Sequence, residues 1–250
     1  MNIQVVSDLH IEYIKNMVKV EDFITPKSSI LVLAGDIGSL YRFDQLFNFL
    51  KDLSKLFKYI LYVPGNHEFY MLSNIKPLPF RILLNRLYQM ENDINNLYIL
   101  NKSSVIIDDI CFIGSTLWSN VPNDFHVPKY RVRIKGFNTY LYQINHNKDK
   151  EFIEKTLQFC QKKNIKSCVI THYPPLKKCL GKSHQNDKFK FLYYNNLDNF
   201  FTKYKINCWI YGHVHYNQSF VFNNCICFSN QLGRVRDNIT NYLKDFTYNF

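Results

Sequence analysis

Five short apolar runs in the sequence stop abruptly at residues that can bind a metal ion or transfer a proton. The clearest run, residues 58–63, ends at Pro64-Gly65 and is followed at once by Asn66, His67 and Glu68. An apolar run of this length that is broken by Pro-Gly is typical of a buried strand, so the three polar side chains are predicted just beyond a strand end. The other four runs have the same form and cover residues 2–7, 29–34, 166–170 and 206–211.

Segments with helical spacing lie between these runs. Apolar side chains recur every three to four residues at 44–57 and 81–87, and residues 151–163 carry the clearest amphipathic pattern. This alternation of strand, loop and helix predicts an α/β fold. In an open α/β sheet, binding sites gather beyond the carboxyl ends of the strands, so we expect the chemistry of this protein there.

The middle of the chain has a different texture. Residues 97–100, 105–107 and 110–114 are strand-like runs whose close spacing predicts antiparallel pairing, the last two joined by a hairpin turn at Asp108-Asp109. Strand-like alternation returns near the end of the chain, before a polar tail, at residues 219–222 and 225–228.

Residues 118–147 form a long polar and aromatic stretch with no clear period. Long aperiodic stretches in compact domains are often lids or binding loops, so we expect an insertion or lid loop here. The stretch carries Arg131 and Arg133, which are candidate substrate contacts because arginine binds phosphate well. An exposed surface position is the simpler interpretation of both arginines.

The composition is that of a globular protein. Hydrophobic residues make up 46% of the 250 residues and no stretch resembles a linker, so we expect one domain over residues 1–250 rather than a disordered chain. No apolar run approaches the ~18 residues of a membrane span. The start of the sequence lacks the regions of a signal peptide, so a cytoplasmic protein without a membrane partner is expected. Seven cysteines with no C-x-x-C pair favour buried thiols and a reducing compartment.

The formal net charge of +11 comes mainly from lysine, because only seven of the 31 basic residues are arginine. Two explanations remain open. Abundant lysine, asparagine, isoleucine and tyrosine are expected from an AT-rich genome, and a basic surface is also typical of nucleic-acid binding. In either case a positive field would steer anionic substrates such as phosphates towards the protein.

Histidine is unevenly distributed along the chain. Five of the eight histidines follow predicted strands, and these are His10, His67, His172, His213 and His215. Together with Asp8, Asp36 and Asn66, which also follow strands, they indicate a shared metal site. The other three, His126, His146 and His184, fall in polar or irregular stretches and are predicted to be solvated.

Several neighbouring residues have simpler roles. Asp8, His10 and Glu12 share strand parity, so their side chains would point the same way if the strand continued. Glu12 and Glu68 are expected to be structural ion-pair or hydrogen-bond partners. Cys225 and Cys227 also share parity, but without further soft ligands they are expected in the core.

The ordered set of motifs resembles the calcineurin-like metallophosphoesterases. The blocks are Asp8-x-His10, Gly35-Asp36, Gly65-Asn66-His67-Glu68, His172 after a strand, and Gly212-His213-x-His215. The resemblance implies two mixed β-sheets packed as a sandwich and flanked by α-helices, with two metal ions at the strand ends. It further implies that Asp8, His10 and His215 hold one ion, that Asn66, His172 and His213 hold the other, and that Asp36 bridges them. His67 would be a catalytic residue rather than a ligand.

One branch of that family fits poorly. Protein Ser/Thr phosphatases carry a longer Gly-Asp-x-x-Asp-Arg-Gly block, whereas Asp36 is followed here by Ile37-Gly38-Ser39-Leu40. Protein phosphatase activity is therefore not expected. The blocks at residues 7–12 and 114–118 look closer to small single-domain phosphoesterases.

The ligand types also indicate which ions would bind. Imidazole, carboxylate and amide ligands without thiolate favour Mn²⁺ first, with Fe²⁺, Co²⁺ or Zn²⁺ as alternatives, and a bridging carboxylate suits two ions ~3.5–4 Å apart. A hydroxide held between them would attack phosphorus, and protonated His67 would act as general acid on the leaving oxygen. Asp44 and Glu68 are both candidates for the acidic partner of His67.

Three functions follow from this site. The first is hydrolysis of a phosphomonoester or phosphodiester in a small molecule or nucleotide. The second is a nuclease of the same family, which the basic charge would favour. The third is a non-catalytic scaffold of the same fold, as in the phosphoesterase-fold subunit of retromer, although every ligand position and His67 are present here.

Overall fold

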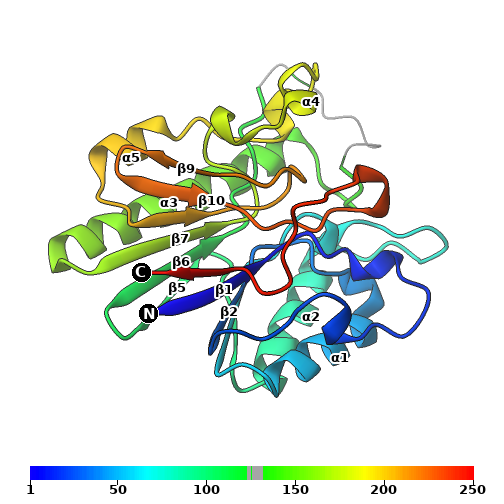
Figure 1. Cartoon of the computed structure of the whole chain (residues 1–250). Helices are drawn as coiled ribbons and strands as arrows, with labels where there is room; N and C mark the ends of the chain where they lie inside the picture. The colour runs from blue at the N-terminus through cyan, green and yellow to red at the C-terminus, as the bar shows by residue number, and fades with distance from the viewer. Residues whose placement is uncertain (123–124, 126–131) are drawn as a thin grey trace.

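The computed structural model describes residues 1–122, 125 and 132–250. Two mixed β-sheets pack against each other and carry helices on their outer faces (Figure 1). The first sheet has the order β11-β1-β2-β3-β4, with β1 Asn2–Val6, β2 Ile30–Leu33, β3 Tyr59–Tyr62, β4 Leu97–Ile99 and β11 Thr247–Asn249. The second has the order β5-β6-β7-β8-β10-β9, with β5 Ser103–Ile107, β6 Ile110–Ser115, β7 Lys166–Thr171, β8 Cys208–Ile210, β9 Ser219–Phe222 and β10 Cys225–Phe228. The predicted fold class is confirmed.

Parallel strands form the centre of both sheets. Strands β1 to β4 are parallel to one another, as are β6, β7, β8 and β10, so their carboxyl ends lie at common edges. The hairpin at Asp108-Asp109 is confirmed, because β5 and β6 pair antiparallel. The antiparallel pairing predicted for residues 97–100 is wrong: β4 pairs parallel with β3. A helix separates β3 from β4 in the sequence, which is the crossover that parallel pairing requires.

The polar tail contains a strand that the sequence pattern did not predict. β11 pairs antiparallel with β1, so the two chain ends lie side by side (Figure 1). Only three residues long and half-exposed, β11 lacks the apolar run that identifies the buried strands.

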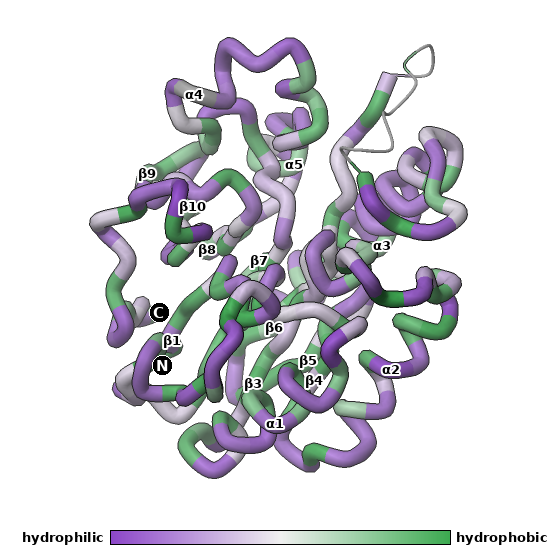
Figure 2. The backbone as a smooth tube through the Cα atoms, turned by 90° about the vertical axis from the view of Figure 1, so that its right-hand side faces the viewer, coloured by the Kyte–Doolittle hydropathy of each residue, from purple (hydrophilic) through white to green (hydrophobic). Residues whose placement is uncertain are grey.

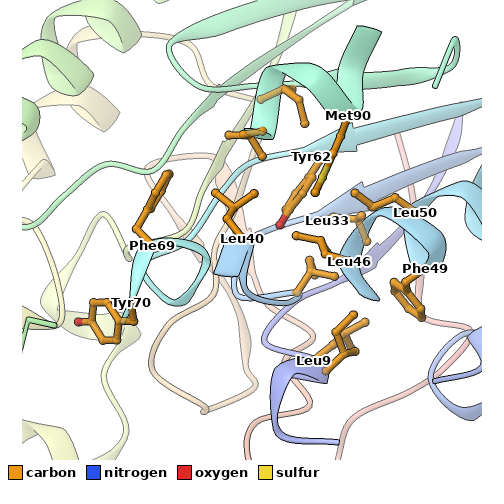
Figure 3. Packing of buried hydrophobic residues seen from close by; sticks show 14 of the residues in the cluster. Leu9, Leu33, Leu40, Leu46, Phe49, Leu50, Tyr62, Phe69, Tyr70 and Met90 are labelled. Carbon is orange, nitrogen blue, oxygen red and sulfur yellow. The ribbon is translucent and has the colours of Figure 1, made fainter. Parts of the chain in front are cut away.

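Alternation along the strands divides the core into layers. Side chains from both sheets meet in the sandwich interior, including Ile3, Val5, Val32, Leu61, Phe112, Ile170 and Ile210. The intervening positions of the first sheet, such as Leu33 and Tyr62, face outward and pack under the helices α1 Phe43–Ser54 and α2 Phe80–Asp93 (Figure 3). Each buried large apolar side chain contributes about 1.5–3 kcal/mol. Figure 2 shows that hydrophobic stretches concentrate in the central strands and hydrophilic ones in the outer loops.

The helices α3 Thr139–Lys163 and α5 Asp198–Lys203 contribute side chains to the core on the outer face of the second sheet, and the short α4 Lys182–Gln185 lies between them in the chain. Helix α3 begins twelve residues before the predicted start at 151. Its buried stripe has helical spacing throughout and consists of Tyr142, His146, Asp149, Ile153, Leu157 and Cys160. Two members of the stripe are polar, which hides the helical period from a search for apolar residues.

His146 is therefore not solvated, contrary to the prediction. Its Nδ1 lies 2.7 Å from the carbonyl oxygen of Trp118, and Asp149 accepts a hydrogen bond from the Trp118 N–H at 3.1 Å. Lys102 pairs with Asp149 at 3.2 Å. The two polar residues thus anchor the chain after β6 to helix α3.

The structure also bears on the cysteines and on membrane insertion. All seven cysteines are buried free thiols, Cys225 and Cys227 among them. Within the ranges that the structure describes, no helix combines the length and hydrophobicity of a membrane-spanning segment.

Candidate metal centre and active site

The candidate site lies in the loops that follow the carboxyl ends of β1, β2, β3, β7 and β8. Five of its residues adopt left-handed backbone conformations, with φ of 55° at Asp8, 51° at His10, 54° at Asp36, 76° at His213 and 46° at His215. Such conformations are uncommon outside glycine and cluster at functional sites. The strand does not continue past Val6, so strand parity does not determine where Asp8, His10 and Glu12 point.

Asp8, His10 and His215 form a first group whose ligand atoms all lie within 4.8 Å of one another. His215 Nε2 lies 3.1 Å from His10 Nε2 and 3.3 Å from Asp8 Oδ1. His10 Nε2 is also 3.9 Å from Asp36 Oδ2. Three ligand-type side chains and one further carboxylate therefore converge on one point.

Asp36, His172 and His213 form a second such group. His172 Nε2 lies 3.3 Å from Asp36 Oδ2, 3.0 Å from Asn66 Oδ1 and 3.3 Å from His213 Nδ1. The same Asp36 oxygen thus faces both groups. Gly35 precedes it with φ of 90°, and a Cβ there would come within 2.4 Å of the His172 ring, so only glycine permits this close approach.

The outer ring nitrogen of each histidine has its own partner. His215 Nδ1 lies 2.5 Å from Asp237 and His10 Nδ1 lies 3.2 Å from Glu12. The other two histidines contact backbone carbonyl oxygens. His172 Nδ1 lies 3.0 Å from the carbonyl oxygen of Ala34, and His213 Nε2 lies 3.3 Å from that of Leu192. An acceptor on the outer nitrogen fixes the tautomer and turns the basic nitrogen inward, as is typical of metal-binding histidines.

This donor set fits divalent transition-metal ions. The inward nitrogens of His10 and His215 face each other at 3.1 Å, and the space between two such nitrogens accepts a proton or a metal cation. Burial lowers the pKa of His172, but Asp36 and Asp8 outweigh it and raise that pKa to about 9. Positive charge is thus favoured on His172 beside these carboxylates, and the ligands of the two groups are imidazole, carboxylate and amide without thiolate.

Glu68 connects two of the loops, as its predicted structural role requires. Its two oxygens accept four hydrogen bonds, from the N–H groups of Asp36 at 3.1 Å, Ile37 at 2.8 Å and Gly65 at 2.7 Å, and from the Tyr62 hydroxyl at 2.6 Å. The loop after β2 and the loop after β3 are therefore fixed to one fully buried carboxylate.

His67 lies beside the two groups that share Asp36. Its N–H donates to Asp36 Oδ1 at 2.7 Å, and its Nδ1 lies 3.2 Å from Glu12 Oε1 and 3.4 Å from the Tyr13 hydroxyl. The acidic partner of His67 is thus Glu12, and neither Asp44 nor Glu68 has this role. Burial holds the pKa of His67 below its ordinary value, although the neighbouring Asp36 and Glu12 carboxylates oppose that shift.

Comparison with known proteins adds the family. The model of the calcineurin-like phosphoesterases matches residues 1–217, which include every candidate ligand discussed above. The chain belongs to the calcineurin-like phosphoesterases. It is 32% identical over 277 residues to the uncharacterized protein L509 of Acanthamoeba polyphaga mimivirus, covering 95% of this chain and 93% of that protein.

A solved structure shows the same fold. Phosphopantetheinyl hydrolase from Mycobacterium tuberculosis matches with a TM-score of 0.74 over 94% of this chain and 90% of that one, at 16% sequence identity. Members of this family act on phosphorylated substrates, typically with two metal ions. The family and the ligand-type groups together support a phosphoesterase hydrolase in general terms.

A cleft of about 1510 Å³ opens over the two groups of this phosphoesterase. Arg133, one of the two predicted substrate contacts, lines it; Arg131 lies outside the described residues, as does His126. His184, which is predicted to be solvated, is partly exposed and also lines the cleft. Sequence reasoning missed one whole wall, formed by residues 232–240 of the polar tail, because no motif identifies Arg234, Arg236 or Asp237.

Proposed function

We propose that this phosphoesterase hydrolyses a phosphomonoester or phosphodiester of a small molecule or nucleotide at a dinuclear metal centre. The observation that carries the proposal is the position of Asp36 Oδ2, 3.3 Å from His172 Nε2 in one ligand group and 3.9 Å from His10 Nε2 in the other. Asp8, His10 and His215 would hold one ion, Asn66, His172 and His213 the other, and Asp36 both. Mn²⁺ suits these ligands, with Fe²⁺, Co²⁺ and Zn²⁺ as alternatives.

When bound, two such ions would lower the pKa of the attacking water and neutralise the phosphate oxygens. The residues of the chain supply orientation. Asp237, Glu12 and two backbone carbonyls hold the imidazoles, and Glu68 holds the loops that carry Asp36 and Asn66. Because these groups are already in place, little reorganisation accompanies the reaction.

His67 would be the general acid. Glu12 and Tyr13 contact its Nδ1, which leaves Nε2 for the cleft that His67 lines. From there it can give a proton to the oxygen that leaves phosphorus, a step typically worth about 10²- to 10⁴-fold in rate. The Glu12 carboxylate favours the protonated imidazole that this step requires.

Residues of the stretch 118–147 that line the cleft support its expected role as a lid or insertion. Val132 and Arg133 come from it and line the cleft, whereas Tyr142, which also lines the cleft, belongs to helix α3. We infer that this stretch covers the substrate within a single catalytic domain in the cytoplasm. Cutting the chain at an inserted protease site in 123–131 should then reduce kcat/KM on a phosphoester without releasing metal.

Metal content and turnover test the proposal together. Protein purified with chelator and reloaded with Mn²⁺ should bind two ions per chain and hydrolyse 4-nitrophenyl phosphate or bis(4-nitrophenyl) phosphate. Asp36→Asn should reduce turnover by more than about 10³-fold because one residue serves both ions. The matched control is Asp44→Asn, an exposed carboxylate on α1. One ion or none at saturation, or near-wild-type turnover of Asp36→Asn with both ions bound, contradicts the dinuclear mechanism.

The same assay separates the other two functions. A nuclease would cleave single-stranded oligonucleotides much faster than either nitrophenyl ester. A scaffold would bind metal and turn over none of them. The convergence of seven ligand-type side chains with His67 beside them favours catalysis over the scaffold.

A further inference from the structure

The charged lining of the cleft differs from the rest of the protein. The sequence has 31 basic residues, of which seven are arginine. Three of those seven line the cleft, Arg133, Arg234 and Arg236, whereas no lysine among the described residues does. A codon bias that favours lysine does not explain why the basic residues that line the cleft are arginines. A guanidinium binds phosphate through two parallel hydrogen bonds, which an ammonium group cannot do.

Arg133 differs from the other two in its partners. The Asp237 carboxylate neutralises part of the charge on Arg234 at 3.5 Å and on Arg236 at 3.8 Å. Across the described parts of the chain, no carboxylate lies within 4.0 Å of the Arg133 guanidinium. The charge of Arg133 therefore has no carboxylate partner among the described residues and can attract an anionic ligand in the cleft.

The protein nevertheless holds Arg133 in place. Its guanidinium lies over the Tyr70 ring, 5.6 Å from the centroid, and its carbonyl oxygen accepts a hydrogen bond from the Met71 N–H at 2.6 Å. A guanidinium stacked on an aromatic face loses little freedom when it binds a ligand. Such support is expected of a binding residue more than of an unconstrained surface charge.

Two tyrosines connect Arg133 with His67. The Tyr70 ring, which supports Arg133, also contacts the His67 ring with centroids 4.8 Å apart. Tyr13, whose hydroxyl is 3.4 Å from His67 Nδ1, is also close enough to Arg133 for the positive charge to act on its hydroxyl. Arg133 is thus separated from the proposed general acid by one tyrosine, and both residues line the same cleft.

We propose that Arg133 binds a second phosphate carried by the leaving group, so that the substrate is the phosphate ester of an alcohol that is itself phosphorylated. This inference rests on the proposed function of His67. In the reaction, the oxygen of water bonds to phosphorus and loses one proton to solvent, and the P–O bond to the alcohol breaks. His67 gives its proton to the alcohol oxygen, and inorganic phosphate and a phosphorylated alcohol leave. An alcohol needs that proton, whereas the leaving phosphate of an anhydride does not, which favours an ester.

Matched substrates test the second phosphate in two chemical settings. Adenosine 3′,5′-bisphosphate is compared with adenosine 3′-monophosphate, and fructose 1,6-bisphosphate with fructose 1-phosphate. In the Mn²⁺-loaded protein, kcat/KM should favour the bisphosphate in at least one pair by about 10- to 100-fold, the range of a charge-assisted hydrogen-bonded pair. The pair that shows the preference identifies a nucleoside or a sugar as the alcohol.

Variants assign that preference to Arg133. Arg133→Ala and Arg133→Gln should each reduce the bisphosphate-to-monophosphate ratio of kcat/KM by about 10-fold or more, and Arg133→Lys should lose less of it. Arg81→Ala, which removes an exposed arginine of α2 outside the cleft lining, is the charge-matched control and should keep the wild-type ratio. Thermal melting shows that the variants are folded.

A binding measurement separates this inference from the proposed function. Calorimetry on chelator-treated, metal-free protein should show that adenosine 5′-monophosphate or fructose 6-phosphate, the phosphorylated alcohols, binds about 10-fold more weakly to Arg133→Ala than to wild type. If no ester is hydrolysed, the proposed function is wrong. The binding measurement alone then tests whether Arg133 contacts the phosphate of the alcohol.

Three results overturn the inference. The first is a bisphosphate-to-monophosphate ratio of kcat/KM near one in both substrate pairs. The second is a wild-type ratio in Arg133→Ala. The third is equally tight binding of the phosphorylated alcohol to metal-free wild type and metal-free Arg133→Ala. A marked preference for oligonucleotides that is lost in Arg133→Ala would replace the small alcohol with a nucleic-acid strand.

Discussion

The Asp237 carboxylate lies 2.5 Å from Nδ1 of His215, on the side of the imidazole that faces away from Asp8 and His10. Asp237 comes from the C-terminal segment, beyond the residues 1–217 that match the family model. The N–H of Arg234 also donates to Asp237 at 2.9 Å, so the carboxylate is fixed in place. A proposed ligand of the first ion is therefore oriented by a segment that wraps back over the cleft.

Asp237→Asn should weaken metal binding. The amide cannot carry the negative charge that makes His215 a stronger ligand, and loss of such an outer partner typically costs about 10- to 100-fold in affinity. Competition with a chromophoric chelator measures the dissociation constant. Asp245→Asn, an exposed carboxylate eight residues further on, should bind as wild type does. Wild-type affinity in Asp237→Asn would show that His215 is either not a ligand or not oriented by this contact.

Metal binding should release protons, and the amount should depend on pH. Burial lowers the pKa of both His172 and His215, but neighbouring carboxylates outweigh burial and raise each pKa to about 9. In metal-free protein at pH 7 both imidazoles are therefore protonated, and an ion must displace those protons to bind. Calorimetry in two buffers of different ionisation enthalpy should give about two protons released at pH 7, falling towards zero above pH 9. Proton release that does not change with pH contradicts the assignment.

The same two shifts predict how the metal-free fold responds to pH. A histidine whose pKa is raised in the folded state stabilises the fold fully below its unfolded value of about 6.5, and that contribution disappears as the pH rises through the folded value. The free energy of unfolding of chelator-treated protein should therefore fall between about pH 6.5 and pH 9. Urea titrations across this range measure it. Saturating Mn²⁺ should reverse the trend, because the ions bind better once the protons have left.

Glu68→Gln should destabilise the fold although the two side chains have almost the same shape. Two carboxylate oxygens accept four donors, and glutamine offers an NH₂ group to two of them. Leaving two buried donors without acceptors costs about 1–3 kcal/mol each. Urea unfolding measures the loss. Glu151→Gln on the exposed face of α3 should change stability by less than about 0.5 kcal/mol, and an equally small change at Glu68 would contradict its role as the link between the loops.

The sequence was sufficient to predict the strands whose ends carry the site and the residues beyond them, and the reason is physical. A strand that is buried on both faces must be apolar throughout, so its end is visible wherever a polar residue interrupts the run, as at Asp8, Asp36 and Asn66. Parallel pairing then brings those ends together without any further information. The expected fold class follows from this property.

What the sequence could not predict depends on side chains whose role is set by distant contacts. Asp237 and Arg234 lie in a polar tail that carries no periodicity, and contacts distant in the sequence anchor that tail beside the site, among them the pairing of β11 with β1 and the hydrogen bond from the Gly233 N–H to the Asp8 carbonyl oxygen. Glu12 becomes the partner of His67 because the chain turns after Asp8 into a left-handed conformation, which no apolar pattern encodes. His146 and Asp149 look like surface residues in the sequence, because their partner is the backbone of Trp118, 28 and 31 residues away in the chain.

The remaining prediction concerns His67 and distinguishes proton transfer from metal binding. If His67 gives a proton to the leaving oxygen, His67→Ala should lose about 10²-fold or more on alkyl phosphates, whose alkoxide leaves poorly, and much less on 4-nitrophenyl phosphate. Both ions should remain bound, because the proposed ligand sets do not include His67. Steady-state rates on the two esters at saturating Mn²⁺, together with metal analysis, measure both quantities.

Glu12 provides the second arm of this test, because its Oε1 contacts both His67 Nδ1 and His10 Nδ1 at 3.2 Å. Glu12→Gln should show the same dependence on the leaving group as His67→Ala, in weaker form, since the amide still orients His67 but no longer favours its protonated state. In the double variant the two losses should not add, because both act on one proton transfer. Equal losses on alkyl and nitrophenyl esters, accompanied by loss of metal, would instead show that His67 is a metal ligand. His67 would then not be the general acid.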